Sequence, residues 1–583
     1  MPDNVLAEKH SFIQETSFQF KTALFIIKRG TANVFSGIKR YDANNTLIDA
    51  PVVAISESAL WNNDDHELNW ILTAGKVENL RIAARLLNKI EIPAGKIFSF
   101  WKFIGNPNLN KGFVIGREIR EGCIVPTRAG GLCQLSNALY DAALKAGFTI
   151  VERHKHTRVI KGSLAEQDRD ATVKWNYVDL RFKSKFSFRI EIDLSADKLI
   201  VKLRSVRPDF DALSPIATSR PAAKLNDCFS CGNYQCFKNP GKTKIEDKSG
   251  ITGFVLDERW PELNNYVSKA AAPGDSFIAP FFKHNHINIV RYTWNVPANK
   301  KSTVAPAAYR RALILRLFRK TNKNVFQQQL KGDQRVALAA VSKIPVAATH
   351  LVLSQNLLPF LWEQGVLGGR TFDVLMTRLP IAHLHQRLDD AHIRHPFSCT
   401  LNDFRAPQTL IDAENAALTN AAKIVTPHAE IAAIFNNKTI RLEWQKPGDL
   451  KTVPGEEILF PASALGRKGA YEMRRLAKEL GLRITIAGNA IEEEGFWGDI
   501  NTRKAGINPL ANIALVIYPT YIEHRPGLLL RAIAAGIPVI TTPASGLSSG
   551  THITIITTGD YDALKQAVQQ YVNIRGYRQP AQA

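Results

Sequence analysis

The chain has 583 residues, of which 45% are hydrophobic and 22% are charged, with a formal net charge of +22 and an isoelectric point near 9.7. A chain of this length exceeds the size of one hydrophobic core, so several domains are expected, and no apolar run approaches the roughly 18 residues that cross a bilayer. The positive charge indicates attraction to polyanions. No helix-turn-helix, zinc-finger or RNA-binding motif accompanies it, which disfavours nucleic acid and leaves an anionic membrane surface or a diphosphate ligand.

The first residues, MPDNVLAEKHSFIQETSF, lack the basic end and the apolar stretch of a secretory signal. Six cysteines are also too few for a disulfide scaffold in so long a chain. We therefore expect a cytoplasmic protein, and peripheral contact with the inner membrane surface is a further hypothesis that the basic charge supports.

The N-terminal third alternates between strand-like and helical patterns. Residues 31–55 alternate like paired strands, residues 77–90 read as an amphipathic helix, and residues 91–105 read as a strand hairpin. A second helix is predicted over residues 136–147, where Gly147 ends it. Alternating strands are predicted after it, at residues 148–160, 171–184, 186–195 and 198–206.

A cysteine directly follows paired glycines at the start of this second helix, in the segment AGGLCQLSNALYDAALKAG. The glycines permit unusual backbone angles, and the helix points its free N–H groups at Cys133. That position favours a thiolate, so Cys133 is a candidate nucleophile or ligand, and the same N–H groups can receive an oxyanion. His154 and Asp170 complete a candidate cysteine, histidine and acid set, whereas a cysteine packed under a helix start is the structural alternative. At most one of His154 and His156 should face Cys133.

Three segments around this cysteine resemble the VanW family: FSFWKFIGNP, GGLCQLSNALYDAALKAGFTIVERHKHT and RDATVKWNYVDLRF. The resemblance covers about residues 80–240 and includes Cys-Gln-x-Ser after a glycine-rich turn, then Glu-Arg-His, then an Arg-Asp-Ala-Thr strand. The family usually shows three glycines before the cysteine region, where this chain has Ala129, Gly130 and Gly131. The family is associated by name with vancomycin and glycopeptide-resistance clusters and with the bacterial cell envelope, and the resemblance implies no settled reaction.

Three further cysteines crowd into CFSCGNYQC, within a polar stretch that lacks periodicity. Clustered thiols in such a loop are read most simply as ligands of zinc or of an iron–sulfur cluster, so Cys228, Cys231 and Cys236 form a candidate metal site. A fourth ligand is missing locally, and Cys123, Cys399, a histidine or water are the candidates for it. Disulfide pairing or solvated thiols are the alternative.

From about residue 251 onward, predicted strands and helices alternate, and this alternation is clearest near the C-terminus. Nearly continuous apolar strands such as IALVIYP and IPVITTP, separated by helices, predict a parallel sheet covered on both faces. Pro526 and Gly527 open a helix after a strand, and the free N–H groups of such a helix bind phosphate. Arg467 and Lys468 lie at another strand-to-helix turn, so the two turns predict a nucleotide crevice at one sheet edge. A doubly wound domain whose loops bind nothing is the alternative.

Residues 251–575 are similar to GT-B glycosyltransferases of the group 1 type. The family's nucleotide-sugar loop has a glutamate, seven further residues and a second glutamate, where this chain has Glu523 and Arg531. The resemblance implies that Glu523 holds the ribose hydroxyls and that Lys468 holds the diphosphate, while the usual preceding arginine is replaced by Ser463. Arg531 in place of the second carboxylate favours readings other than sugar transfer.

The predicted fold class is therefore an α+β VanW-like domain followed by an α/β region made of two Rossmann-like parallel-sheet halves of GT-B type. The predicted domains are a strand-rich segment (1–79), the α+β domain (80–208), a cysteine-containing linker (209–250), a GT-B N-terminal-like half (251–436) and a C-terminal nucleotide-sugar-binding half (437–583).

Together these patterns predict a glycosyltransferase that moves a sugar from a nucleotide sugar to a glycan or lipid-linked precursor of the cell envelope. A thiol-dependent hydrolase or transpeptidase centred on Cys133 is one alternative, and a non-catalytic, metal-held binding protein is another. The residues predicted to bind the nucleotide sugar are Lys468, Glu523, Gly527, Arg467 and Arg531.

Overall fold

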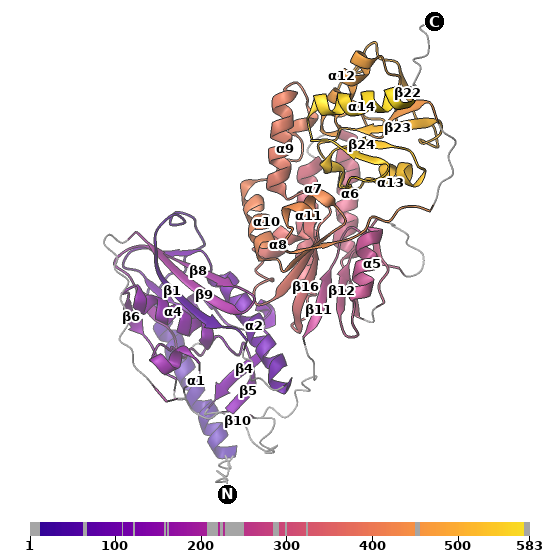
Figure 1. Ribbon diagram of the computed structural model, residues 1–583. Coiled ribbons are helices and arrows are strands. Elements are labelled where there is room, and N and C mark those ends of the chain that lie inside the picture. Colours follow the sequence, from indigo (N-terminus) through magenta and orange to yellow (C-terminus); the bar gives the residue numbers. More distant parts are fainter. Residues whose placement is uncertain are drawn as a thin grey trace. The chain divides into compact units, whose positions relative to one another are not determined.

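The computed structural model describes residues 12–575 except 62–66, 108, 121–122, 157–158, 160–161, 176, 207–219, 222–225, 228–249, 284–290, 298–299, 322–324 and 449–454. The chain divides into two compact units (Figure 1). The first comprises Met1–Ile251 with Pro345–His350 and Gln364–Thr371, and the second comprises Thr252–Ile344, Leu351–Glu363 and Phe372–Ala583. The five-part division expected from the sequence is finer than this and stays a prediction.

The first unit is an α+β assembly around an antiparallel sheet of four strands in the order β1-β9-β8-β2. Helix α4 packs on β1 and β9, and its buried face joins the core that fills this unit. The elements are α1 (Phe12–Phe35), β1 (Val52–Ala59), α2 (Glu67–Leu87), β2 (Ile90–Ile92), β3 (Ile97–Ser99), α3 (Phe100–Ile104), β4 (Ile115–Arg120), β5 (Cys123–Arg128), α4 (Cys133–Lys145), β6 (Thr149–Glu152), β7 (Arg181–Lys183), β8 (Phe188–Leu194), β9 (Lys198–Ser205) and β10 (Asn226–Asp227).

Three local predictions for this unit are wrong. Residues 31–35 do not form a strand but end helix α1, because helical hydrogen bonding propagates from the preceding turns. The hairpin expected at residues 91–105 is absent because β2 pairs with β8, whereas β3 pairs with β7 in another sheet. The long strands expected at 148–160 and 171–184 shrink to β6 and β7, since the chain between them is held by side-chain hydrogen bonds to Asp170 instead of a ladder.

The second unit begins with a seven-stranded sheet in the order β15-β12-β11-β16-β17-β18-β19. In chain order this is 3-2-1-4-5-6-7, so the direction of winding reverses between β11 and β16. The elements are β11 (Ile251–Val255), α5 (Pro261–Ala270), β12 (Ser276–Ala279), β13 (Phe281–Phe282), β14 (Thr293–Trp294), β15 (Lys300–Thr303), α6 (Ala305–Thr321), α7 (Val325–Val341), β16 (Ala348–Ser354), α8 (Leu358–Glu363), β17 (Thr371–Leu375), α9 (Ile381–Arg394), α10 (Gln408–Asn420), β18 (Lys423–Thr426), α11 (Ala429–Ile434) and β19 (Thr439–Arg441).

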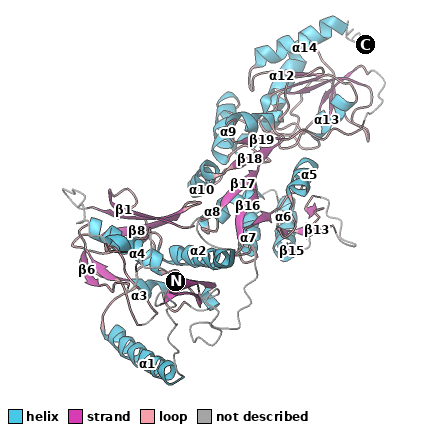
Figure 2. Ribbon diagram, turned by 60° about the horizontal axis from the view of Figure 1, so that its bottom comes forward, coloured by secondary structure: helices cyan, strands magenta, loops and turns pink. Residues whose placement is uncertain are grey.

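The C-terminal half of this unit has a six-stranded parallel sheet in the order β22-β21-β20-β23-β24-β25. In chain order this is 3-2-1-4-5-6, the order of a Rossmann fold, and the winding reverses between β20 and β23. Figure 2 draws the helices of this half in cyan and its strands in magenta. The elements are β20 (Glu457–Phe460), α12 (Ala470–Leu480), β21 (Ile484–Ile486), β22 (Thr502–Lys504), β23 (Ile513–Tyr518), α13 (Gly527–Ala534), β24 (Val539–Thr541), β25 (Ile553–Ile555) and α14 (Tyr561–Arg575).

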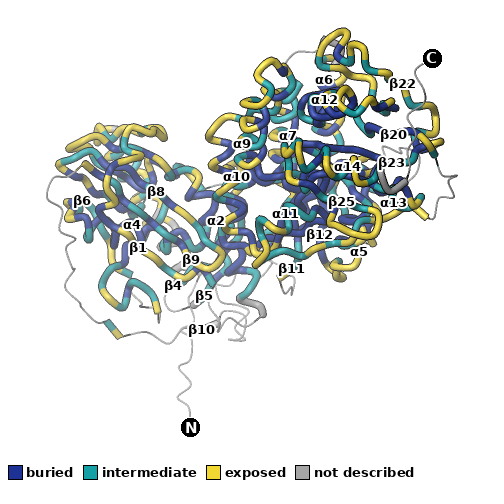
Figure 3. Tube along the Cα trace, turned by 45° about the horizontal axis from the view of Figure 1, so that its top comes forward, coloured by how far each residue is buried: buried dark blue, intermediate teal, exposed yellow. Residues whose placement is uncertain are grey.

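Burial explains why the sequence signal is strongest in this half. Every residue of β20 is buried, and β23 is buried at all but one position (Figure 3). Parallel strands covered on both faces must be apolar throughout, which is the pattern that the sequence carries. The predicted fold class, an α+β domain followed by two Rossmann-like parallel-sheet halves, is confirmed. Within the described residues, no helix combines the length and the low polarity needed to span a bilayer.

Candidate functional site

The two residues predicted to grip a nucleotide lie together at the point where the C-terminal sheet reverses its winding. Lys468 follows β20 and Glu523 follows β23, and these strands are neighbours in the sheet. Lys468 Nζ lies 2.9 Å from Glu523 Oε2 and donates a second hydrogen bond of 2.9 Å to the carbonyl oxygen of Ile522. A reversal point of this kind is where open α/β sheets bind ligands, outside the carboxyl ends of the strands.

The Glu523 carboxylate is held in its charged form. Burial opposes ionisation, but the charge of Lys468 and hydrogen bonds from Tyr518 and Lys468 outweigh it and keep the pKa of Glu523 below its ordinary value. Both partners retain some solvent exposure, 23% for Lys468 and 18% for Glu523, so a ligand can compete for either of them.

The other three predicted donor-binding residues are Arg467, Gly527 and Arg531. Arg467 forms an ion pair of 2.8 Å with Asp403, and its guanidinium carbon lies 5.2 Å from the centre of the Phe404 ring. Gly527 is the first residue of α13 and is exposed, with no atom within 4 Å of the position a Cβ would take. Arg531, one turn further along α13, is also exposed. A phosphate can therefore approach the start of α13 closely.

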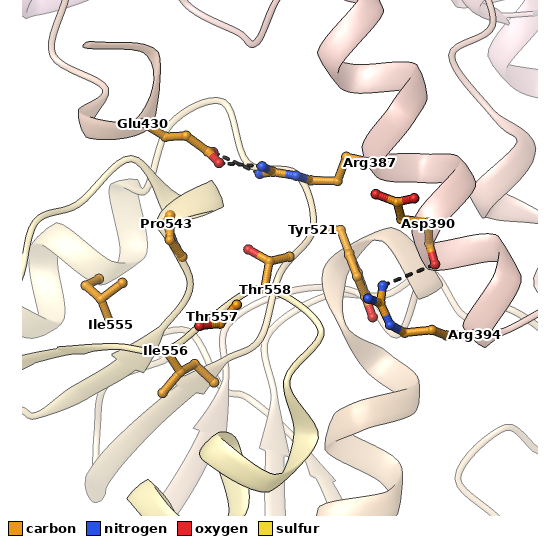
Figure 4. A pocket seen from close by; sticks show the side chains of 10 residues that line it. All are labelled: Arg387, Asp390, Arg394, Glu430, Tyr521, Pro543, Ile555, Ile556, Thr557 and Thr558. Carbon is orange, nitrogen blue, oxygen red and sulfur yellow. Dashed lines mark hydrogen bonds and ion pairs between the residues drawn. The ribbon is translucent and has the colours of Figure 1, made fainter. Parts of the chain in front are cut away.

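A pocket of about 460 Å³ opens between the two halves of the second unit (Figure 4). On one side Arg387, Asp390 and Arg394 of α9 and Glu430 of α11 line it, and Arg387 pairs with Glu430. The other side consists of loops at the carboxyl ends of β23, β24 and β25, including Tyr521. Its size is that of a small-molecule site. Lys468 and Glu523 do not line this pocket, so it adjoins the predicted nucleotide position without containing it.

The sequence reasoning missed a buried charged cluster at the reversal point of the N-terminal sheet. Asp257 follows β11, and both of its carboxylate oxygens bind Arg311 of α6, at 2.7 and 2.8 Å. Arg311 also binds Asp333 at 2.6 Å, and Asn356, which follows β16, donates to Asp257 at 2.6 Å. Burial and the nearby Asp257 charge raise the pKa of Asp333 to about 6. The available signal was an acidic residue directly after an apolar strand, in GFVLD.

The structure places His156, not His154, in the predicted set with Cys133 and Asp170. His156 Nδ1 lies 2.7 Å from Asp170 Oδ2, and Cys133, whose sulfur donates to the carbonyl oxygen of Val173 at 3.7 Å, is close enough to affect the pKa of the same imidazole. Burial opposes a charge on His156, but the bonds to Asp170 and Cys133 outweigh it and raise its pKa to about 9. His154 is 52% exposed and lies 3.4 Å from Glu152. Strand β6 ends at Glu152, and the backbone beyond it turns His156 inward while His154 faces outward.

The residues behind Cys133 fix the start of α4 in place. Gln134 Nε2 donates to the carbonyl oxygen of Ala59 at 2.7 Å and to Ser58 Oγ at 2.9 Å. Ser136 Oγ donates to the carbonyl oxygen of Ala171 at 2.5 Å. The Cys-Gln-x-Ser motif therefore combines the candidate cysteine with two side chains that anchor the helix on which it lies.

The paired glycines before Cys133 are required by close backbone approach. A Cβ on Gly131, whose φ is +96°, would lie 2.1 Å from Lys76 Cγ. A Cβ on Gly130 would lie 2.5 Å from the carbonyl oxygen of Gly116. Only glycine fits these positions without moving buried neighbours.

The predicted metal ligands Cys228, Cys231 and Cys236 lie outside the described residues. In the part of the chain that the structure does describe, no group of three or more His, Cys, Asp or Glu side chains is placed to hold a metal ion. Zinc or iron–sulfur binding by the cysteine cluster stays a prediction.

Residues 75–204 match the family described as "VanW like protein". The chain is 29% identical over 152 residues to the vancomycin B-type resistance protein VanW of Enterococcus faecalis, which covers 25% of this chain and 54% of that protein. It is 32% identical over 109 residues to the uncharacterized protein YoaR of Bacillus subtilis, covering 19% of this chain and 35% of that protein. The matches thus span about half and about a third of these relatives' lengths. The chain carries a VanW-like domain, as its motifs predicted.

Among solved structures, the chain is similar to a sucrose-phosphate synthase from Thermosynechococcus elongatus, with 14% identity and a TM-score of 0.34. That match covers 57% of this chain and 91% of the synthase chain.

Proposed function

We propose that this chain, which carries a VanW-like domain, is a glycosyltransferase of the GT-B type whose second unit moves a sugar from a nucleotide sugar to a glycan precursor of the bacterial cell envelope. The observation that carries the proposal is the 2.9 Å pairing of Lys468 with Glu523 at the reversal point between β20 and β23. A lysine supplies the cation that a diphosphate requires, and an ionised carboxylate at such a point accepts hydrogen bonds from ribose hydroxyls.

In the absence of ligand, Lys468 and Glu523 neutralise each other. A bound nucleotide would replace this ion pair by two interactions: the diphosphate would pair with the ammonium group of Lys468, and the ribose hydroxyls would donate hydrogen bonds to the carboxylate of Glu523. The open space beside Gly527 would let a phosphate approach the start of α13, and the exposed Arg531 would add positive charge to that helix. Arg467 would hold the loop through its ion pair with Asp403.

The pocket between the halves is the proposed acceptor position. It faces the carboxyl ends of β23 to β25, and two of its lining residues, Arg387 and Arg394, are basic. Those guanidinium groups suit a phosphate or carboxylate on a lipid-linked or glycan acceptor. The Enterococcus faecalis relative is a vancomycin resistance protein by name, and we propose an envelope acceptor for this chain on that basis.

Binding of three nucleoside diphosphates (UDP, GDP and ADP) and of inorganic pyrophosphate, measured by calorimetry, tests the proposal. Replacing Lys468 by Ala should weaken all four ligands, whereas Glu523→Gln should weaken the best nucleoside diphosphate by about 10- to 100-fold and spare pyrophosphate. The exposed residues Lys504 and Glu494 supply the matched controls Lys504→Ala and Glu494→Gln. Equal effects of the Glu523 and Glu494 variants would reduce the Lys468–Glu523 pair to a structural ion pair.

Activity is tested separately by the release of nucleoside diphosphate from a panel of nucleotide sugars. Release that depends on Glu523 supports transfer. Tight nucleotide binding without release would make the second unit a binding module, the reading that Arg531 in the second carboxylate position favours.

We further propose that α6 rests on an anionic membrane surface. Tyr309, Leu313 and Leu317 form an exposed stripe at helical spacing, with exposed fractions of 43%, 61% and 58%, and exposed Arg310 and Arg316 flank it. Apolar side chains bordered by arginines suit the headgroup region of anionic lipids.

Co-sedimentation with phosphatidylglycerol vesicles tests this surface. Leu313→Glu should lower the partition coefficient by about tenfold, because a leucine side chain contributes roughly 1.5–3 kcal/mol when fully buried. Leu338 of α7, which is 44% exposed, supplies the control variant Leu338→Glu. Equal partitioning of the two variants, or no binding by the unaltered protein, would remove α6 from the proposal.

A further inference from the structure

The first unit contains a nucleophile, a base and an acid in series, and the nucleotide site uses none of them. His156 binds Asp170 through Nδ1 at 2.7 Å, so Nε2 is the ring nitrogen left to serve Cys133, whose sulfur donates to the carbonyl oxygen of Val173 at 3.7 Å. The order is therefore Cys133 Sγ, His156 Nε2, His156 Nδ1 and Asp170 Oδ2. This is the arrangement that activates a nucleophile through an oriented imidazole.

Asp170 is fully buried and fixes the imidazole from several directions. Its Oδ2 also accepts the backbone N–H of His156 at 2.6 Å, and its Oδ1 accepts Arg153 at 3.0 Å and Arg220 at 3.2 Å. Arg220 donates in addition to the carbonyl oxygen of His156 at 2.9 Å. The backbone and the ring of His156 are thus both held. Burial opposes ionisation of Asp170, but hydrogen bonds from His156 and the charges of His156 and Arg153 keep its pKa below the ordinary value.

Cys133 and His156 remain accessible while Asp170 is not. The His156 side chain is 22% exposed and Cys133 is partly exposed, so a reactant can reach the sulfur. Cys133 is the first residue of α4, so it lies at the positive end of the helix dipole. Asp170 has both carboxylate oxygens engaged by His156 and two arginines, which argues against a shared metal ion.

We propose that Cys133 and His156 are the catalytic residues of an acyl-transfer centre in the first unit, with Asp170 as their positioning residue, and that its substrates are amides or esters. The Cys133 thiolate attacks the carbonyl carbon, a C–S bond forms, and the carbonyl π electrons move to oxygen. On collapse, the C–N or C–O bond breaks and the leaving group takes the proton from His156 Nε2.

The thioester that results is resolved by water or by an acceptor amine. His156 Nε2 takes the proton of that nucleophile, the new C–O or C–N bond forms, and the C–S bond breaks to return the thiolate. No oxidant, reductant or metal enters the cycle. Asp170 stays ionised throughout and keeps Nε2 directed at the sulfur.

Cys399 provides an internal comparison for the reactivity of Cys133. It is exposed, and its sulfur lies 3.4 Å from Glu492 Oε2. Burial and the Glu492 carboxylate raise the pKa of the Cys399 thiol. Only a few per cent of an ordinary thiol is ionised at pH 7, so a thiolate paired with an imidazolium should react about tenfold faster or more.

The first test follows iodoacetamide labelling of the full chain at pH 7 by peptide-resolved mass spectrometry. Cys133 should be labelled at least about tenfold faster than Cys399, and His156→Gln should remove that advantage while Cys399 keeps its rate. The exposed His154 supplies the matched control, His154→Gln, which should change neither rate. Labelling of Cys133 no faster than Cys399, or equal effects of the two histidine variants, would overturn the proposal.

The second test separates acyl transfer from mere thiol reactivity. With p-nitrophenyl acetate the protein should release a burst of nitrophenolate close to one equivalent, with an acetyl group on Cys133 in the trapped protein. Cys133→Ser and His156→Gln should abolish the burst, and unchanged melting temperatures would exclude misfolding. Rapid alkylation without acetylation of Cys133 would refute acyl transfer. Loss of nucleotide binding in the second unit bears on the glycosyltransferase proposal alone.

Discussion

Replacing Asp170 by Asn should destabilise the first unit far more than the same change at Asp168. Both carboxylates bind Arg153, at 3.0 Å for Asp170 and 3.2 Å for Asp168, but Asp170 is 0% exposed and Asp168 is 25% exposed. Removing the buried carboxylate leaves Arg153 and a charged His156 without their compensating charge, at a cost of about 3–5 kcal/mol. The exposed partner should contribute only about 0–1 kcal/mol.

Hydrogen exchange of the α4 amides measures this difference within the unit concerned. Asp168→Asn is a clean control because Asp168 has a φ of +55°, a left-handed conformation that asparagine tolerates well. We expect protection of α4 to fall by about two to three and a half orders of magnitude in Asp170→Asn and by less than one in Asp168→Asn. Equal losses in the two variants would refute the view that burial of Asp170 sets the strength of the cluster.

Two further changes probe the same region. The pKa of His156 is raised from 6.5 to about 9. Its protonation should therefore contribute roughly 3 kcal/mol to the free energy of unfolding, in full below pH 6.5, and this contribution should be lost as the pH rises through about 9. The difference between the urea midpoints at pH 6 and at pH 9.5 should accordingly shrink in His156→Gln. Gly131→Ala should lower the free energy of unfolding by at least about 2 kcal/mol, since its Cβ would lie 2.1 Å from Lys76 Cγ. Gly95→Ala, at φ +72° with no atom within 4 Å, should lower it by only about 1 kcal/mol. Similar urea midpoints of the two variants would count against close packing at Gly131.

For the α/β region, the hydrophobic pattern of the sequence was sufficient to predict the parallel sheets. Strand β23 is apolar along its length and β20 is apolar after Glu457, and helices separate them, so a covered parallel sheet is the arrangement that buries them. Carboxyl ends of parallel strands share one edge, which is why the turns that carry Lys468 and Glu523 could be expected to converge. The distance of 2.9 Å between them follows from the strand order, which places β20 beside β23.

The strands of the first unit were harder to predict. Alternation at residues 148–160 was real in the sequence, yet β6 ends at Glu152. The backbone that follows is held by hydrogen bonds from Arg153 to Asp168 and Asp170, contacts that local periodicity does not encode.

By itself, the sequence determined the order of the domains, the position of Cys133 at a helix start and the presence of a histidine and an acid near it. Only the tertiary structure decided that the histidine is His156, because residues two apart on a strand share one face, so periodicity does not distinguish His154 from His156. That choice depends on Asp170, which binds both the ring and the backbone of His156, and on Arg220, which is 64 residues away in the chain. Contacts between segments so distant in sequence arise only when packing brings their charges into one buried cluster.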